Sequence, residues 1–224
     1  GVKFLPMGNT GNQMGGWFNK EMNTADDYKG LKMRMPGLGG RTIGKLGATA
    51  VLMGGPDILT SLASGAIDAA EWICPVADLG LGMHQAAKFY YGPGWHEPST
   101  LLDLSIDLKE WEGLDGDTQG LMMEMAKAFN VDVFSRFQAL NGPALGKLLN
   151  EHGVALKTFP DELLIALGNA AGEVMEERGS INSQTKAICN HILSFRKNIM
   201  DWSTKGESEF ARIRNLPFKF PSSV

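Results

Sequence analysis

The sequence has few of the residues and motifs that mark metal, redox and nucleophile sites. Its two cysteines, Cys74 and Cys189, lie far apart and outside any CxxC pair, and its four histidines lack HExxH or paired-ligand spacing. The stretch GLGGRTIG matches neither GxGxxG nor a P-loop, and no GxSxG elbow occurs. These absences argue against a zinc site, a dithiol centre and nucleotide binding. We expect buried free thiols and structural or exposed histidines.

Clustered positive charge and long apolar runs are also missing. The net charge is -4 and basic residues form only short pairs, which argues against nucleic-acid binding. No apolar run approaches the roughly 18 to 20 residues that span a bilayer, and no basic-then-apolar leader opens the chain. With 43% hydrophobic residues the composition is that of a soluble globular protein. The chain opens as if in mid-domain, so we expect an N-terminal part to be absent.

Short alternating elements fill the first half of the sequence, and long helices fill the second. The alternation predicts an α/β unit with helices over 24–30, 37–47 and 56–65 and strands over 31–35, 48–53 and 67–73. A strand over 101–108 follows the turn-rich stretch YYGPGWHEPS, and apolar periodicity predicts helices from Leu121, over 161–178 and over 184–202. We place a boundary near residue 98, with an α/β lobe over 1–98 and a hinge strand, long helix and C-terminal helices over 99–224.

Arg34 is a candidate anion-binding residue. It stands at the end of a predicted strand, before a Pro-Gly turn and a Gly-rich helix start. Ligands of α/β sheets bind beyond the carboxyl ends of strands, and a guanidinium matches a carboxylate or phosphate. The alternative is an ordinary surface ion pair. A binding arginine predicts that Arg34→Ala abolishes ligand binding with little effect on the fold.

Two acids, each beside a tryptophan, form the next candidates. Glu71 and Trp72 follow a predicted strand, and Trp95 and Glu97 lie in the turn-rich stretch. Such carboxylates suit a hard cation such as calcium or sodium, or they could form an acid/base pair. Each acid alone is more often exposed or salt-bridged.

The loop GNTGNQMGGWF offers amide oxygens. Asn12 or Gln13 could supply one to a cation or a ligand, although a simple tight turn is the plainer interpretation of such a loop.

Four ordered stretches resemble the DctP-type solute receptors of TRAP transporters. They are GNTGNQMGGWFNKEM, DYKGLKMRMPGLGG, LTSLASGAIDAAEW and AAKFYYGPGWHEP. The similarity is continuous over residues 8–112 and weaker through the helical half, and it is closest to the branch that binds 2-oxo acids or lactate with a metal ion. The resemblance implies a periplasmic-binding-protein-like, two-lobed α/β fold whose first lobe lacks its N-terminal part here.

The resemblance also implies roles for the candidate residues. Arg34 matches the arginine that holds the ligand carboxylate, and Trp72 and Trp95 would wall the ligand cleft. The implied cation ligands are Gln13, Glu71, Trp72 and Glu97. Gln13 and its neighbour Asn12 are the candidate amide contacts to the ligand. The cation would be calcium or sodium, bound together with the ligand.

The implied function is capture of a small 2-oxo or 2-hydroxy monocarboxylate, of the pyruvate, lactate or 2-oxobutyrate type. The receptor would be periplasmic, would deliver its ligand to membrane permease subunits and would not be an enzyme. A rival is a metal-dependent acid/base enzyme that uses Glu71 and Glu97 on a small carboxylate. A third expectation is that the C-terminal helices form a homodimer, as in some relatives of this branch.

Overall fold

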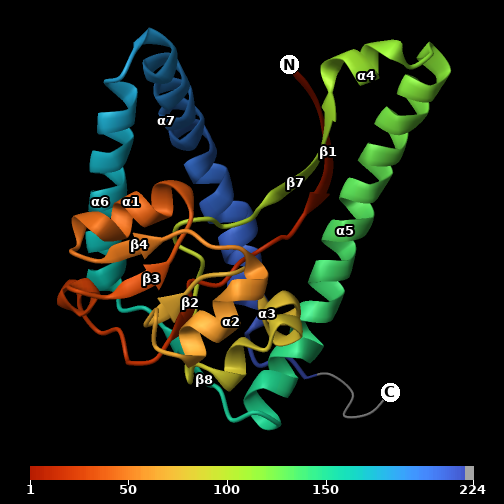
Figure 1. The fold of residues 1–224 in the computed structure, drawn as a ribbon. Coiled ribbons are helices and arrows are strands. Elements are labelled where there is room, and N and C mark those ends of the chain that lie inside the picture. The colour runs from red at the N-terminus through yellow and green to blue at the C-terminus, as the bar shows by residue number, and fades with distance from the viewer. Residues whose placement is uncertain (220–224) are drawn as a thin grey trace. The chain divides into compact units, whose positions relative to one another are not determined.

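The computed structural model describes residues 1–219, and Figure 1 shows their fold. The chain divides into two compact units, Gly1–Ala171 and Gly172–Val224. The predicted boundary near residue 98 does not coincide with this division, and the assignment of residues to lobes stays a prediction.

A six-stranded sheet organises the first unit. Its strands are β2 (Gly16–Phe18), β3 (Lys32–Arg34), β4 (Thr49–Val51), β5 (Ala69–Ala70), β6 (Phe89–Gly92) and β8 (Ala155–Thr158). Their order is β4-β3-β5-β2-β6-β8. β3 is parallel to both β4 and β5, so the carboxyl ends of these three strands meet at one edge. β2 runs antiparallel to β5 and β6, and β8 runs parallel to β6.

The two faces of this sheet carry separate cores, because successive strand residues point to opposite faces. Trp17 and Tyr90 are buried in one core, where their rings stack with centroids 4.1 Å apart. Their chain neighbours Phe18 and Tyr91 are buried in the other, where their rings meet edge to face. Burying such side chains contributes roughly 1.5–3 kcal/mol each. The aromatic pairs therefore fix which side of each strand faces which core.

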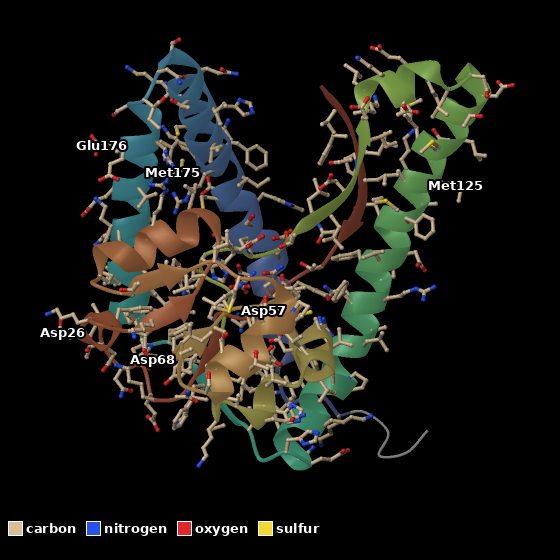
Figure 2. All side chains as sticks on the ribbon, in the orientation of Figure 1. Asp26, Asp57, Asp68, Met125, Met175 and Glu176 are labelled. Carbon is tan, nitrogen blue, oxygen red and sulfur yellow. The ribbon has the colours of Figure 1, made fainter. Side chains whose placement is uncertain are left out.

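Helices join the parallel strands. α1 (Gly37–Lys45) connects β3 to β4, and α2 (Gly55–Ala63) connects β4 to β5. Pro56 lies at the start of α2 and Asp57 in its first turn, where Figure 2 labels it. These positions suit a residue without a free N–H and a negative charge near the helix dipole. The short helices η1 (Ala25–Tyr28), α3 (Pro75–Leu81) and η2 (Met83–Gln85) complete this region.

A long antiparallel ribbon and a long helix form the remainder of the first unit. The ribbon pairs β1 (Val2–Asn9) with β7 (Leu101–Asp107), and α4 (Leu108–Gly113) leads into α5 (Gly116–Asn150). Figure 1 shows α5 running beside β1. Leu5, Trp111 and Ala126 form a small core here. Many other apolar side chains are exposed, including Met125, which projects from α5 in Figure 2.

The described part of the second unit, up to residue 219, is mostly helical. It contains the end of α6 (Asp161–Gly179), then α7 (Ser183–Ser203), the π-helical η3 (Thr204–Ser208) and α8 (Glu209–Arg214). Asn182 caps α7, because its side chain accepts from the Thr185 N–H at 2.9 Å while the Thr185 hydroxyl accepts from the Asn182 N–H. None of the residues of α7 is buried.

The predicted elements agree closely with the structure. All six elements expected over residues 24–73 are present, and the helices predicted from Leu121, over 161–178 and over 184–202 are α5, α6 and α7. Several shorter elements were missed, among them α3, β6 and β8. The prediction of a mere turn-rich junction is wrong for its first residues, because Tyr90 and Tyr91 are buried strand residues of β6.

Candidate functional site

The candidate site begins where three parallel strands end. Arg34 is the last residue of β3, the central strand of the three, and Glu71 follows directly after its neighbour β5. Met53 lies two residues beyond β4 on the other side. Arg34 reaches both neighbours, since its Nε donates to the Met53 carbonyl at 3.4 Å and its Nη1 donates to the Glu71 carbonyl at 2.6 Å. The sheet order alone thus places this arginine between two strand ends.

Arg34 and Glu71 also form a buried ion pair. Arg34 Nη1 lies 2.8 Å from Glu71 Oε2, and the two side chains are only 9% and 1% exposed. A carboxylate this deeply buried is costly unless it is paired. Of the two alternatives for Glu71, exposure or a salt bridge, the structure shows the salt bridge. Arg34 does form an ion pair, as its alternative interpretation held, but the pair is buried and not on the surface. No described residue accepts a hydrogen bond from Nη2 of Arg34, so one end of the guanidinium has unused donors.

His96 lies on the other oxygen of Glu71. Its Nε2 is 3.6 Å from Glu71 Oε1, and its side chain is almost completely buried. Neither ring nitrogen of His96 has a hydrogen-bond partner among the described residues. His96 also contacts Trp95, whose ring meets the imidazole edge to face at 5.3 Å. The expectation of a merely structural or exposed histidine gave no hint of this position beside Glu71.

Trp72 closes the strand-end side of the site. The Arg34 guanidinium lies over the indole ring of Trp72 in a cation–π contact, with Arg34 Cζ 5.2 Å from the ring centroid. The ring also lies against the start of α2, where a Cβ on Gly55 would come within 2.9 Å of it. Only glycine at position 55 leaves room for the indole.

A second cluster lies on two loops and is held by threonine hydroxyls. Gln13 Nε2 donates to the hydroxyls of Thr10 at 2.9 Å and Thr100 at 2.7 Å. The Thr10 hydroxyl donates to the Gly11 carbonyl, and the Thr100 hydroxyl donates to Glu97 Oε1 at 2.5 Å. Gln13 and Glu97 are thereby joined through a single hydroxyl.

This network fixes the orientation of the Gln13 amide. Each hydroxyl has one proton, and the protons of Thr10 and Thr100 are both donated elsewhere. The two hydroxyls can therefore only accept from Gln13, which requires its NH₂ to face them and its Oε1 to face away. Gln13 Oε1 is buried and has no hydrogen-bond partner among the described residues. It is a preoriented acceptor.

Backbone hydrogen bonds bring the two clusters together. The Met14 N–H donates to the Ile73 carbonyl at 2.9 Å, which ties the loop of Gln13 to the segment after Trp72. The Gly94 N–H donates to the Gln13 carbonyl at 2.8 Å. A Cβ on Gly94 would lie 2.8 Å from that carbonyl oxygen, so this close approach requires glycine.

Unpartnered polar atoms gather at this site. Among the described residues, eight buried side-chain nitrogen or oxygen atoms have no hydrogen-bond partner, and five of them belong to Gln13, Glu71, Trp95 and His96. Buried polar atoms are normally paired, and exceptions call for a water, an ion or a ligand. Their concentration at the carboxyl edge of the sheet indicates a binding site.

The donor set fits a hard cation better than a transition metal. Within residues 1–219 there is no group of three His, Cys, Asp or Glu side chains that could hold a metal ion. The oxygens that are available instead come from an amide, carboxylates and the Trp72 carbonyl, to which no described residue donates. Calcium and sodium accept such mixed oxygen ligands.

Asp78, in the first turn of α3, is buried and hydrogen-bonds to the backbone just after Trp72. Its Oδ2 accepts from Trp17 Nε1 at 2.9 Å and from the Tyr90 hydroxyl at 2.7 Å, and its Oδ1 accepts from the Ile73 N–H at 3.1 Å. Burial raises the pKa of the Asp78 carboxyl to about 6, although these three donors oppose the rise. No pattern in the sequence pointed to Asp78.

Most predicted site residues converge, but one does not. Arg34, Glu71 and Trp72 are in contact, Gln13 and Glu97 share Thr100, and the two sets meet through the backbone. Trp95 joins through His96 and is half-buried. Asn12 is exposed and makes no side-chain hydrogen bond with a described residue. Thr10, Thr100 and His96 were missed.

A family model shows where this architecture belongs. The model of the DctP family, described as bacterial extracellular solute-binding protein family 7, matches residues 1–180. The chain belongs to the DctP family. A monocarboxylate 2-oxoacid-binding periplasmic protein of Nostoc sp. is 39% identical over 206 residues, which are 92% of this chain and 56% of that protein. The family consists of solute receptors, so the rival of an acid/base enzyme is not supported.

Solved structures of TRAP solute-binding proteins have the same fold. The Pseudoalteromonas atlantica protein, with bound sodium and pyruvate, has a TM-score of 0.90 at 34% identity over 98% of this chain and 65% of its own. The Colwellia psychrerythraea protein, with bound calcium and pyruvate, has a TM-score of 0.89 at 35% identity over 95% and 65%. The Bordetella bronchiseptica protein, a mixed-occupancy dimer with calcium and picolinate in one site, has a TM-score of 0.91 at 32% identity over 95% and 63%.

The match between this DctP chain and its relatives covers only part of each relative's length. It spans just over half of the Nostoc protein and under two thirds of each of these solved chains, which have the two-lobed fold. No helix in the described part of the chain has the length and apolar character needed to cross a membrane.

Proposed function

We propose that this chain binds a small 2-oxo or 2-hydroxy monocarboxylate together with calcium or sodium, in the periplasm, for delivery to TRAP permease subunits. Pyruvate, lactate and 2-oxobutyrate are the ligand types. One observation carries the proposal: a buried arginine with unused donors is paired with an acid that has an unpartnered oxygen, and a backbone hydrogen bond ties that segment to the loop of Gln13, whose buried amide oxygen is also unpartnered. The solved relatives that hold pyruvate or picolinate with a cation support it.

Arg34 is the proposed contact to the ligand carboxylate. Glu71 and the Met53 carbonyl occupy its Nη1 and Nε, which leaves Nη2 to donate to a ligand. The pairing with Glu71 holds the guanidinium in a single orientation before any ligand arrives. Trp72 and Trp95 would provide apolar walls, and the exposed Asn12 an additional amide contact.

Four oxygens are the proposed cation ligands. They are the Gln13 amide oxygen, carboxylate oxygens of Glu71 and Glu97, and the Trp72 carbonyl. A bound cation would supply positive charge to both the carboxylate and the 2-oxo or hydroxyl oxygen of the ligand. Gln13 and Glu97 hold their places through Thr100, so the loop oxygens would be arranged before the cation binds.

A titration tests the proposal. Pyruvate, lactate and 2-oxobutyrate are added in turn to the purified chain with calcium, with sodium or with a chelator, while tryptophan emission is recorded. We expect saturable changes that require one of the two cations and that the chelator abolishes in a sodium-free buffer. A Glu97→Gln variant should bind calcium at least about tenfold more weakly, whereas the matched control Glu110→Gln removes an exposed acid of α4 and should bind normally. Binding that is unchanged in a sodium-free buffer containing the chelator would contradict the shared site.

We propose in addition that α7 pairs with a second copy of the chain. Exposed apolar residues recur along it at Ile188, Ile192, Phe195 and Trp202, a spacing typical of helices that associate along one seam. The solved dimer of the Bordetella relative is consistent with self-association.

Sedimentation measured over a range of concentrations tests the pairing. We expect a dimer whose dissociation constant rises at least tenfold in Ile192→Asp, while Ile165→Asp, at an exposed apolar residue of α6, leaves it unchanged. A monomer at every concentration would exclude the dimer.

A further inference from the structure

The three residues that follow β5 have unequal backbone hydrogen bonding. The Glu71 carbonyl accepts from Arg34 Nη1 at 2.6 Å, and the Ile73 carbonyl accepts from the Met14 N–H at 2.9 Å. Between them, no described residue donates to the Trp72 carbonyl. The segment is therefore held on both sides of one open acceptor.

The direction of the Trp72 carbonyl is set by the hydrogen bond that the Ile73 N–H of the same peptide unit makes. The peptide between Trp72 and Ile73 is trans, and in a trans peptide the N–H and the C=O point in opposite directions. Its N–H donates to Asp78 Oδ1 at 3.1 Å. The Trp72 carbonyl consequently points away from Asp78.

Asp78 itself has little freedom to move. Its second oxygen accepts from Trp17 and Tyr90, whose rings stack in the core of the sheet, and its own N–H donates to the Cys74 carbonyl at 2.9 Å. A carboxylate held in this way polarises the peptide that it bonds, since a charged acceptor draws the N–H and increases the negative charge on the carbonyl oxygen.

We propose that Asp78 is a positioning residue that aims and polarises the Trp72 carbonyl as a ligand of the cation. This inference rests on the proposed cation site, to which it adds a residue that touches neither the ion nor the carboxylate. Outer residues that orient a metal ligand typically change metal affinity by about 10–100-fold when they are replaced. A purely structural Asp78 would change stability without changing calcium affinity.

Isotope labelling gives a direct readout, because residues 72 and 73 are the only Trp–Ile pair in the sequence. Carbonyl-¹³C tryptophan with ¹⁵N isoleucine yields one NMR correlation peak, from this peptide alone. In the parent chain titrated with calcium chloride, we expect the peak to move saturably, with the Trp72 carbon shifting downfield. Calcium binding recorded by tryptophan emission without movement of this peak would overturn the proposal.

Variants separate the positioning role from a structural one. Asp78→Asn should weaken calcium binding about tenfold. Leu148→Ala removes a buried core side chain of α5 that makes no hydrogen bond in this network, so it should lower stability and leave calcium affinity unchanged. Equal calcium affinity in Asp78→Asn and the parent would overturn the role of Asp78 but leave the proposed cation site standing. A parent chain that binds no calcium or sodium would overturn the cation site and this inference with it, and if Asp78→Asn does not fold, the parent peak decides.

Discussion

Replacing Arg34 by alanine tests how the candidate site is built into the fold. The substitution leaves Glu71, which is 1% exposed, without its cationic partner. Removing one member of a buried pair costs about 3–5 kcal/mol, because the remaining charge is buried and uncompensated. Against a total stability of about 5–15 kcal/mol, this is a large loss. The structure thus opposes the expectation from sequence that Arg34→Ala barely changes the fold.

Urea unfolding measures this loss, and a double-mutant cycle assigns it. In a cycle of Arg34→Ala, Glu71→Gln and the double variant that carries both, both charges are removed in the double variant, so it should be more stable than the sum of the single losses by more than about 1 kcal/mol. Arg136→Ala is a matched control, since its 2.8 Å pair with Asp132 is mostly exposed and should cost at most about 1 kcal/mol. A loss below about 1 kcal/mol for Arg34→Ala, with an unchanged urea slope, would refute the argument.

Two further predictions concern titratable groups that are not proposed to contact the ligand or the cation. Burial, and then the His152 ring 4.0 Å away, lower the pKa of His84, so stability is kept above about pH 6.5 and lost as pH falls below it. His84→Asn should therefore lessen the fall in melting temperature on acidification, and an unchanged fall would exclude His84 as its source. Burial raises the pKa of the Cys74 thiol to about 11, so in a Cys189→Ser chain a thiol reagent should react slowly until urea is added; fast native labelling would contradict this burial.

The sequence predicts the fold best where local signals and chain order agree. Strands β3, β4 and β5 alternate with α1 and α2, and left-handed glycines at Gly47 (φ 90°) and Gly65 (φ 74°) follow those helices as expected. Residues that pair across long distances escaped prediction. β8 lies beside β6 only because α5 carries the chain back to the sheet, and no local pattern encodes that return.

The candidate site divides in the same way. Arg34 and Glu71 could be placed because parallel strands end at a common edge, which is a rule about topology. The hydroxyls of Thr10 and Thr100 could not, since a threonine in a loop has many partners and only the folded loops show which one it takes. Whether His96 is a core histidine or a neighbour of Glu71 depends likewise on a contact made across 25 residues of chain.

Charge explains why cation and ligand should bind together in the proposed site. Arg34, Glu71 and Glu97 sum to one negative charge, and a bound monocarboxylate makes two. Sodium would lower this excess to one negative charge and calcium would remove it, so calcium should support the tighter binding. Linkage requires that calcium strengthen pyruvate binding by the same factor by which pyruvate strengthens calcium binding, typically about 5–150-fold. Calorimetric titrations in both orders measure the two factors, and a calcium factor near one would show that the ions do not meet in this site.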